Sequence, residues 1–125
     1  MFENASCSAV LPASDINRAK SFWRDKFDLE PIDASVPDAA MYEINGTQVF
    51  VYETTFAGTA QNTAMAIDVP DLDTVMSELR SRGVEFNEYD IPGIKTVDGI
   101  AEIDGQRGAW FNDSEGNIIG LGEQR

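Results

Sequence analysis

Residues 109–117 have the sequence Ala-Trp-Phe-Asn-Asp-Ser-Glu-Gly-Asn, which predicts a tight connection between two strands. The four residues at 113–116 suit a type I turn that closes with a glycine in the left-handed region. Apolar residues continue on both sides of the turn. We therefore predict a hairpin with strands at 107–112 and 117–122.

The register of this hairpin decides what Trp110 faces. If Asp113 pairs with Asn117, Trp110 lies opposite Gly120, and the missing side chain leaves room beside the indole for a stacked ring. If the turn slips by one residue, Trp110 instead packs into the core. The sequence leaves both alternatives open.

Two other segments repeat one pattern: a short apolar strand, a capping aspartate and an amphipathic helix. In the first copy, a strand at 7–11 precedes Asp15 and a helix with one apolar face. In the second, a strand at 64–69 precedes Asp71 and a helix that ends at Gly83. Close to half of the 125-residue chain separates the two aspartates, which indicates an internal duplication.

Hairpins continue the first half after its helix. We predict strands at 32–36, 39–44 and 47–53. Asn45-Gly46 joins the last two, and this dipeptide favours a hairpin because both turn positions tolerate positive φ.

The second half contains one further strand, at 84–88, before its terminal hairpin. A glycine-bearing stretch at 89–105 lies between them, and its part at 91–99 is interpreted as a lid, an extra hairpin or a dimer contact. Each half therefore has the order βαβββ. We predict a single α+β domain of two modules, at about 1–57 and 62–125, with mixed sheets.

The segment 109–117, the stretch from Asp15-Ile16 to Phe22-Trp23 and the duplication resemble the vicinal oxygen chelate superfamily. That superfamily includes glyoxalase I, bleomycin-resistance proteins, fosfomycin-resistance enzymes and extradiol dioxygenases. The resemblance covers nearly the whole chain. It implies two sheets curled around a cleft, within or across a homodimer, but it implies no particular reaction.

The resemblance also implies where a divalent metal would bind. Metal-binding members carry His, Glu or Gln on the first and last strands of each module. The matching positions here hold Ser8, Val49 or Val51, Ala64 and Gly120, which cannot replace imidazole, thiolate or carboxylate donors. Because histidine is also absent, we predict no metal and no cofactor, which argues against glyoxalase, dioxygenase and fosfomycin-transferase activity.

Strand alternation selects the residues expected to face the cleft. The predicted ligand-binding residues are Trp110, Tyr42, Ser8, Glu53, Asp68 and Gly120. Tyr42 can donate a hydrogen bond to a ligand oxygen or simply pack in the sheet. Glu53 and Asp68 can act as an acid–base pair, bind a cation, or lie solvated at strand ends. No catalytic residue is assigned.

The composition narrows the possible partners. The chain carries 22 acidic and 9 basic residues, for a formal net charge of −13, and no cluster of Lys and Arg. Such a surface repels phosphate backbones and anionic lipids, so we predict binding to neither nucleic acid nor membranes. The single Cys7, expected in the core, forbids an internal disulfide, and the N-terminus shows no targeting signal, so we expect a cytoplasmic protein.

These features lead to three hypotheses about function. The first is a metal-free, homodimeric small-molecule-binding protein with an apolar or aromatic ligand against Trp110. A drug-sequestering role like that of bleomycin-resistance proteins suits it, since an acidic cleft attracts a cationic antibiotic. The second is a metal-independent isomerase or lyase acting on a small carbonyl compound through Glu53, Asp68 or Tyr42. The third is an interaction subunit whose cleft is closed by side chains.

Overall fold

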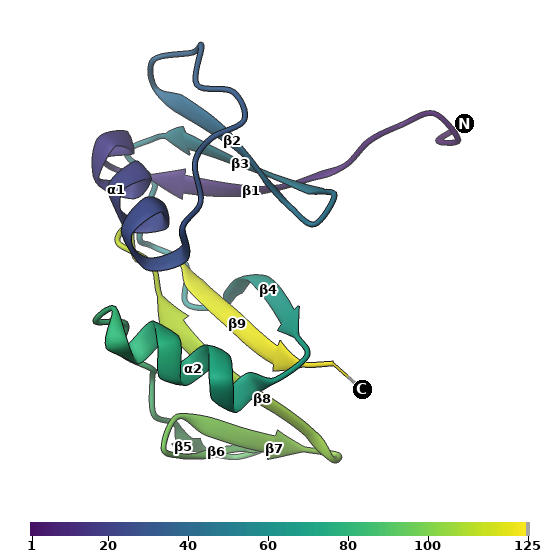
Figure 1. Ribbon diagram of the computed structural model, residues 1–125, viewed down its shortest axis with the longest axis vertical. Helices are drawn as coiled ribbons and strands as arrows, with labels where there is room; N and C mark the ends of the chain where they lie inside the picture. Colours follow the sequence, from purple (N-terminus) through teal and green to yellow (C-terminus); the bar gives the residue numbers. More distant parts are fainter. Residues whose placement is uncertain (125) are drawn as a thin grey trace.

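Two sheets, each accompanied by one helix, follow one another along the chain in the computed structural model, which describes residues 1–124 (Figure 1). The first half contains β1 (Ser8–Ala13), α1 (Ile16–Phe27), β2 (Ala39–Ile44) and β3 (Thr47–Glu53). The second half contains β4 (Thr63–Val69), α2 (Leu72–Ser81), β5 (Asp90–Ile91), β6 (Ile94–Val97), β7 (Ile100–Ile103), β8 (Gln106–Asn112) and β9 (Ile118–Glu123).

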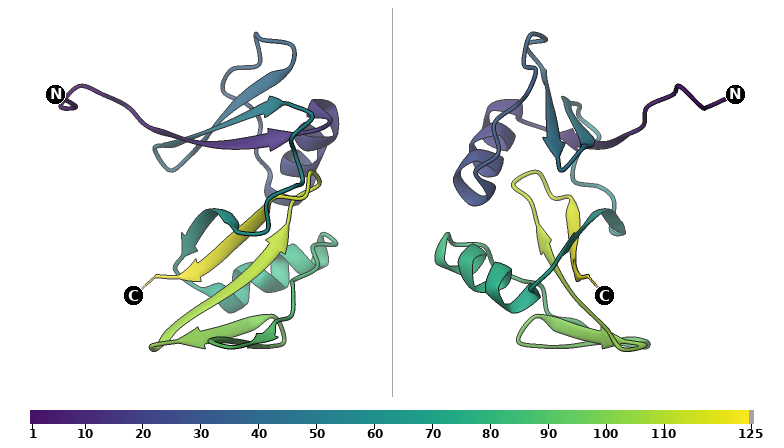
Figure 2. Two further views of the ribbon diagram at one scale, coloured as in Figure 1. Left: turned by 180° about the vertical axis from the view of Figure 1, so that it is seen from behind. Right: turned by 45° about the vertical axis from the view of Figure 1, so that its right-hand side comes forward.

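The sheets combine parallel and antiparallel pairs. The first has the order β1-β3-β2 and the second the order β4-β9-β8-β7-β6-β5. In both, the strand before the helix pairs in parallel with the last strand of its half. Both helices lie on one side of the molecule, and the sheets form the other side (Figure 2). The α+β class with curled mixed sheets is therefore confirmed.

The predicted helix starts are also confirmed, and they show the duplication directly. Asp15 and Asp71 are the N-caps of α1 and α2, and each accepts a hydrogen bond from the backbone N–H three residues on. A glutamate from the last strand of the same half adds a second acceptor. Glu53 accepts from the first N–H of α1, and Glu123 accepts from the first N–H of α2.

Two predicted strands are wrong. Residues 32–36 form only the bridge between Asp33 and Met41, because prolines flank the segment and the Asp33 side chain accepts the Ser35 N–H in a local turn. Residues 84–88 form only the bridge between Phe86 and Phe111. The chain there has just left α2 through Gly83, at φ 88°, and its contact with β8 is limited to this antiparallel bridge and the hydrogen bonds of Asn87.

The stretch at 89–105 forms three short strands, β5 to β7, which extend the second sheet by antiparallel pairing. Its turns contain glycines at positive φ, as does the predicted turn at Asn45 (φ 47°) and Gly46 (φ 87°). Of the three interpretations for its part at 91–99, the structure bears out additional hairpin strands.

One carboxylate fastens the two halves together. Glu115, in the turn between β8 and β9, accepts hydrogen bonds from the N–H groups of Ser14 and Asp15, both at 2.9 Å, at the start of α1. It also pairs with Arg18, whose Nε lies 2.8 Å from Oε2. The Glu115 side chain is 1% exposed, while that of Arg18 is 53% exposed. The turn at 113–116 is therefore a structural joint, and we call this cluster of Glu115, Ser14, Asp15 and Arg18 the latch.

Opposing effects act on the carboxyl groups of this turn. Burial by itself would raise the pKa of Glu115, but hydrogen bonds from Arg18, the Asp15 N–H and Ser114 outweigh it and lower the pKa to about 2. Burial raises the pKa of Asp113, although hydrogen bonds from Asn117 oppose this shift. Glu115 is therefore held ionised by its partners.

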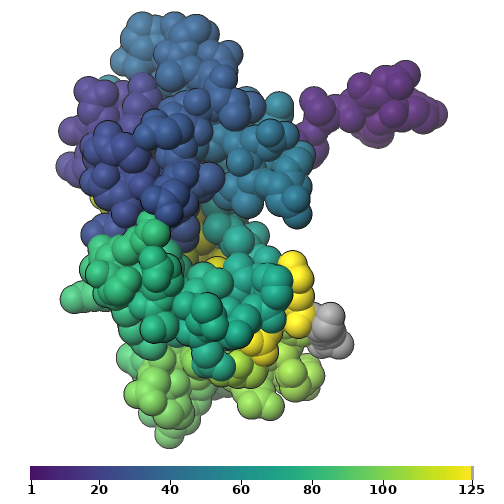
Figure 3. Space-filling model, in the orientation of Figure 1, coloured from purple at the N-terminus to yellow at the C-terminus, as the bar shows by residue number. Residues whose placement is uncertain are grey.

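Aromatic packing completes the joint between the halves. Phe27, at the end of α1, stacks on the fully buried Phe111 of β8, with ring centroids 5.4 Å apart. The space-filling view shows the halves in contact and the N-terminal residues projecting from the body (Figure 3). Cys7 belongs to that projecting segment and is exposed, so its prediction as a core residue is wrong. Neither helix within residues 1–124 has the length and apolar character needed to cross a bilayer.

Candidate ligand-binding pocket

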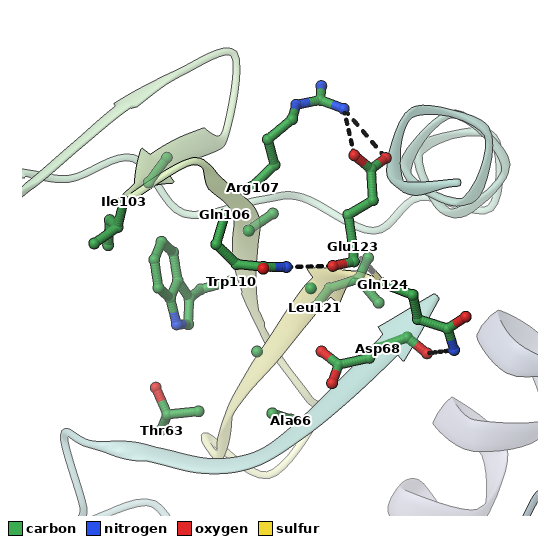
Figure 4. A pocket seen from close by; sticks show the side chains of 15 residues that line it. Thr63, Ala66, Asp68, Ile103, Gln106, Arg107, Trp110, Leu121, Glu123 and Gln124 are labelled. Carbon is green, nitrogen blue, oxygen red and sulfur yellow. Dashed lines mark hydrogen bonds and ion pairs between the residues drawn. The ribbon is translucent and has the colours of Figure 1, made fainter. Parts of the chain in front are cut away.

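The second sheet carries a pocket on the face turned away from α2. The terminal hairpin has the first of the two registers considered, with Trp110 opposite Gly120 and Phe111 opposite Ile119. Phe111 and Ile119 are buried on the helix side, so Trp110 lies on the other face. There it lines a cavity of about 650 Å³ formed by β4, β7, β8 and β9 (Figure 4). That volume is within the range of small-molecule sites.

Small residues make the floor of the pocket. An ideal Cβ at Gly120 would lie 3.3 Å from Thr63 Cγ2 and 3.7 Å from the Trp110 indole nitrogen. A Cβ at Gly122 would lie only 2.4 Å from Asp68 Oδ1. The absence of a side chain at Gly120 therefore lets Thr63 and the indole approach the strand, and its absence at Gly122 lets the Asp68 carboxylate lie over the strand.

The walls place an aromatic ring opposite a carboxylate. Figure 4 shows Trp110 and Asp68 on opposite sides of the space, with Ile103 close to the indole and Thr63 at one end. Tyr89 packs against the indole in a T-shaped contact, with ring centroids 5.6 Å apart and planes at 86°. The pocket thus offers a flat apolar surface, a hydroxyl group and one negative charge.

Arg107, the only cationic residue among the lining residues of the described chain, is already paired. Its guanidinium lies 2.8 Å from Asp73 and 3.2 Å from Glu123. Hydrogen bonds from Arg107 to these two carboxylates raise the pKa of the guanidinium. An anionic ligand would therefore find no uncompensated positive charge among the described residues of the pocket.

The sequence-predicted residues separate into two groups. Trp110, Asp68 and Gly120 meet in the pocket, whereas Tyr42, Glu53 and Ser8 do not line it. Ser8 lies on the first sheet, on the face away from α1, and its hydroxyl lies 3.5 Å from Gln48 Oε1.

The expected orientation of Tyr42 and Glu53 is wrong. Tyr42 is 2% exposed and lies beside Trp23 and Val49 under α1, and Glu53 accepts the first N–H of that helix. The cause is the sequence at 49–52, where apolar residues occupy both faces of the strand. Without an alternation of apolar and polar residues, the sequence does not indicate which face lies against the core. In the actual register Val49 and Val51 are buried, and the intervening residues face outward.

The donor set does not fit a metal at the positions that the resemblance implies. With the corrected register, the β3 residues that share a face with Ser8 are Gln48 and Phe50. Even with the Gln48 amide, the set that includes Ala64 and Gly120 lacks the donors that hold a transition metal. We therefore assign no chemical step to a metal in this chain.

Within residues 1–124, one cluster of three acidic side chains has a spacing suited to a metal ion: Asp71, Asp73 and Glu123. Their oxygens already accept hydrogen bonds from Arg107, from Thr74 and from the first N–H of α2. The cluster thus serves as the cap of α2.

Several pocket residues were missed by sequence reasoning. The sequence could have identified Gly122 as a pocket residue, because it lies two positions beyond Gly120 and therefore shares its face of the strand. Thr63 lies one residue outside the predicted strand. Ile103 belongs to β7, which could not be placed while part of the stretch at 89–105 had three interpretations.

The fold and the pocket define a two-module α+β protein with an open ligand site on one sheet. Residues 7–121 match the model of the Glyoxalase/Bleomycin resistance protein/Dioxygenase superfamily, and the chain belongs to this family. The sequence-based resemblance is thereby confirmed. No curated protein matches the chain.

Solved structures with the same fold share little sequence with this chain. A superfamily member from Sphaerobacter thermophilus has a TM-score of 0.71 at 21% identity, covering 99% of this chain and 100% of its own. A glyoxalase/bleomycin resistance protein from Catenulispora acidiphila has a TM-score of 0.68 at 24% identity, covering 96% and 98%. A mutant of the fosfomycin resistance protein FosX from Listeria monocytogenes, complexed with Mn(II) and 1S,2S-dihydroxypropylphosphonic acid, has a TM-score of 0.68 at 21% identity, covering 98% and 90%. At these identities the likeness shows the fold alone.

Proposed function

We propose that this protein is a metal-free, small-molecule-binding member of its superfamily, whose ligand stacks a ring on Trp110. The observation that carries the proposal is an open cavity of about 650 Å³ that has small residues on its floor and the Trp110 indole on its wall. Stacking on an aromatic face and burial of apolar area would supply most of the binding energy. A role in sequestering a drug in the cytoplasm, as in bleomycin-resistance proteins, fits a site that binds without reacting.

A comparison with FosX supports a metal-free site. The FosX complex contains Mn(II) and a phosphonic acid. The pocket described here has neither a metal-binding donor set nor an unpaired cation among its described residues. Shared fold therefore does not carry that ligand chemistry over to this chain.

The alternative of a metal-independent isomerase or lyase loses most of its candidate residues. Tyr42 and Glu53 lie under and at the start of α1, so neither reaches the pocket. Of the candidates only Asp68 remains, and the other carboxylate of the pocket, Glu123, is already held by Arg107 and the first N–H of α2. The binding function is the better supported of the two.

Calorimetry tests the binding function. The protein is dialysed against a chelator and titrated with bleomycin, as a probe of sequestration, and with 4-methylquinoline, as a simple ring compound. We expect heat of binding that survives the chelator and weakens about tenfold or more in Trp110→Ala. Binding that appears only after a divalent metal is restored, or no binding of either probe at high protein concentration, would contradict the proposal.

We also propose that the chain acts as one domain of two modules, at about 1–57 and 62–125, within a homodimer that covers the pocket. All lining residues come from the second half, which leaves one side open. On the first sheet, Phe50 and Tyr52 lie on the outer face with ring planes at 11°, beside Val10, which is 54% exposed. An aromatic face of this kind complements a hollow floor.

The free sheet edges favour the same pairing. β1 and β4 each end their sheet, and most of β4 is exposed. Unpaired strand edges readily take a strand from another chain. In the proposed dimer, the outer face of the first sheet of one copy covers the pocket of the other, and the reverse contact follows by twofold symmetry.

Light scattering after size exclusion tests the dimer. We expect the mass of a dimer for the natural chain and of a monomer for Phe50→Asp, which places a charge in the apolar contact. Phe56→Asp is the matched control, because Phe56 is 78% exposed on the loop after β3 and lines neither the pocket nor the surface around Phe50, and it should remain dimeric. A monomeric natural chain at high concentration would contradict the proposed dimer without affecting the binding function.

A further inference from the structure

We infer that the pocket selects a ring-bearing organic cation, with Trp110 as the stacking surface and Asp68 as the residue that determines specificity for charge. This inference rests on the proposed binding function and adds the chemical class of the ligand. It follows from the placement of Asp68, the state of Arg107 and the character of the ring opposite.

Asp68 extends over the floor of the pocket. It lies on the outer face of β4, opposite Gly122 in the register. The 2.4 Å between its Oδ1 and an ideal Cβ on Gly122 shows that the carboxylate occupies the space that any larger residue would fill. Figure 4 shows the carboxylate directed toward the side of the pocket where Trp110 lies.

Nothing in the described chain neutralises this carboxylate. The hydrogen bond to Gln124 in this region uses the Asp68 backbone carbonyl and leaves the side-chain oxygens for a ligand. Among residues 1–124, the ion pairs of the pocket join Arg107 to Asp73 and Glu123, not to Asp68. Asp68 is exposed, so its carboxylate is accessible to a ligand, and a positively charged group beside it gains Coulomb energy.

The opposite wall of the pocket, formed by Trp110, also favours a positively charged ligand. The face of an indole attracts cations through its quadrupole, and Trp is the strongest of the aromatic residues in this respect. Tyr89 packs against the Trp110 ring in a T-shaped contact, which helps to hold the orientation of the indole. A cationic ring between Trp110 and Asp68 therefore gains from both walls.

An anion gains from neither wall. The Arg107 charge is shared between two carboxylates, and the whole chain carries a formal net charge of −13. A phosphonate such as the one bound by FosX would meet the Asp68 carboxylate without compensation. The pocket thus combines the superfamily fold with a charge preference opposite to that ligand.

Three isosteric probes test the inference: 1-methylquinolinium, 4-methylquinoline at mildly alkaline pH, where it is neutral, and quinoline-4-carboxylate. Binding is followed by calorimetry at low and high salt. We expect the natural protein to bind the cation about tenfold more tightly than the neutral ring and the anion most weakly, with the preference for the cation reduced by salt. Asp68→Asn should weaken cation binding about tenfold and leave the neutral ring unchanged.

Two further variants make the test specific. Glu85→Gln removes the same charge from an exposed position outside the pocket, and it should change cation binding less than about twofold. Gly122→Ala keeps the charge but forces the Asp68 carboxylate to move, and it should also lose the preference for the cation. Melting temperatures establish that each variant is folded.

The outcomes separate this inference from the function on which it rests. Equal binding of the cation and the neutral ring by the natural protein, or an unchanged preference in Asp68→Asn, would overturn the inference and leave the binding function standing. If none of the three probes binds to the natural protein, both the inference and the binding function are overturned.

Discussion

The two halves of the molecule share one plan, but their outer faces are opposites. β3 and β9 both end in a glutamate that caps the helix of their own half, Glu53 and Glu123. Counting back from these glutamates, Phe50 and Tyr52 on β3 are equivalent to Gly120 and Gly122 on β9.

The inner positions of these strands are alike, since Val51 and Leu121 are both buried under helices. Helix packing constrains the inner face in both halves, because core volume must be conserved. The outer face is under no such constraint. It has therefore become a filled aromatic surface in one half and a hollow in the other.

The largest expected effect comes from breaking the latch between the halves. Glu115→Gln removes a buried charge that donors from four residues hold in place, and we expect the free energy of unfolding to fall by about 3 kcal/mol. Denaturant titration measures this change. Glu43→Gln, on the exposed edge strand β2, is the control and should change stability by less than about 0.5 kcal/mol.

The pH dependence of the latch has a definite sign. Because the pKa of Glu115 is lowered to about 2 in the folded chain, its contribution is complete above pH 4.5, its ordinary value, and is lost as pH falls toward 2. The raised pKa of Asp113 acts in the opposite direction, since its protonation relieves a buried charge. The stability difference between the natural chain and Glu115→Gln should therefore shrink between these pH values. A difference that stays constant with pH would contradict this account.

The next effect comes from making the second outer face resemble the first. Gly120→Leu fills the hollow beside Trp110, and we expect binding of ring compounds to weaken at least about a hundredfold while the fold persists. Ala60→Leu, at an exposed position between the halves, is the control and should bind normally. Unchanged binding in Gly120→Leu would mean that the ligand site lies elsewhere.

The sequence predicts the shared plan of the halves better than their difference. Helix caps and the Asn45-Gly46 turn depend on local chemistry, and both are confirmed. Of the two registers that the sequence left open for the terminal hairpin, the structure has the one that pairs Asp113 with Asn117, whose backbone groups are hydrogen-bonded at 2.9 Å. This local pairing also fixed the faces of Trp110 and Gly120.

Where the two faces of a strand are equally apolar, the local sequence does not indicate which of them is buried. The sequence Val-Phe-Val-Tyr at 49–52 is compatible with either orientation, and only the long-range parallel pairing with β1 decides it. The latch was unpredictable for a similar reason. Its partners, Glu115 and the start of α1, lie about one hundred residues apart along the chain.

A smaller effect tests whether the two capping glutamates are equivalent. Glu53→Ala and Glu123→Ala each remove an acceptor at a helix N-terminus, and we expect each to cost about 1 kcal/mol of unfolding free energy. Glu123→Ala should cost somewhat more because Arg107 loses one partner. Denaturant titration of both variants measures the difference. A Glu53 variant that leaves stability unchanged but abolishes a ligand response would restore the acid–base hypothesis.

The smallest expected effect concerns Tyr42, where we expect a substitution to stabilise the protein. By the same match of registers, Tyr42 on β2 is equivalent to Phe111 on β8, and both rings lie under helices. The Tyr42 hydroxyl is buried and has no hydrogen-bond partner within residues 1–124. Burial raises the pKa of this phenol, with a contribution from the charge of Glu30, so the group stays neutral.

Tyr42→Phe makes the first half identical to the second at this position and removes an unsatisfied polar atom. We therefore expect the free energy of unfolding to rise by about 1 kcal/mol, with ligand binding unchanged. Tyr89→Phe is the matched control, since its hydroxyl accepts a hydrogen bond from Asn87, and its stability should not rise. A loss of stability or of binding in Tyr42→Phe would show that the hydroxyl has a partner in solution, and it would return Tyr42 to the set of candidate functional residues.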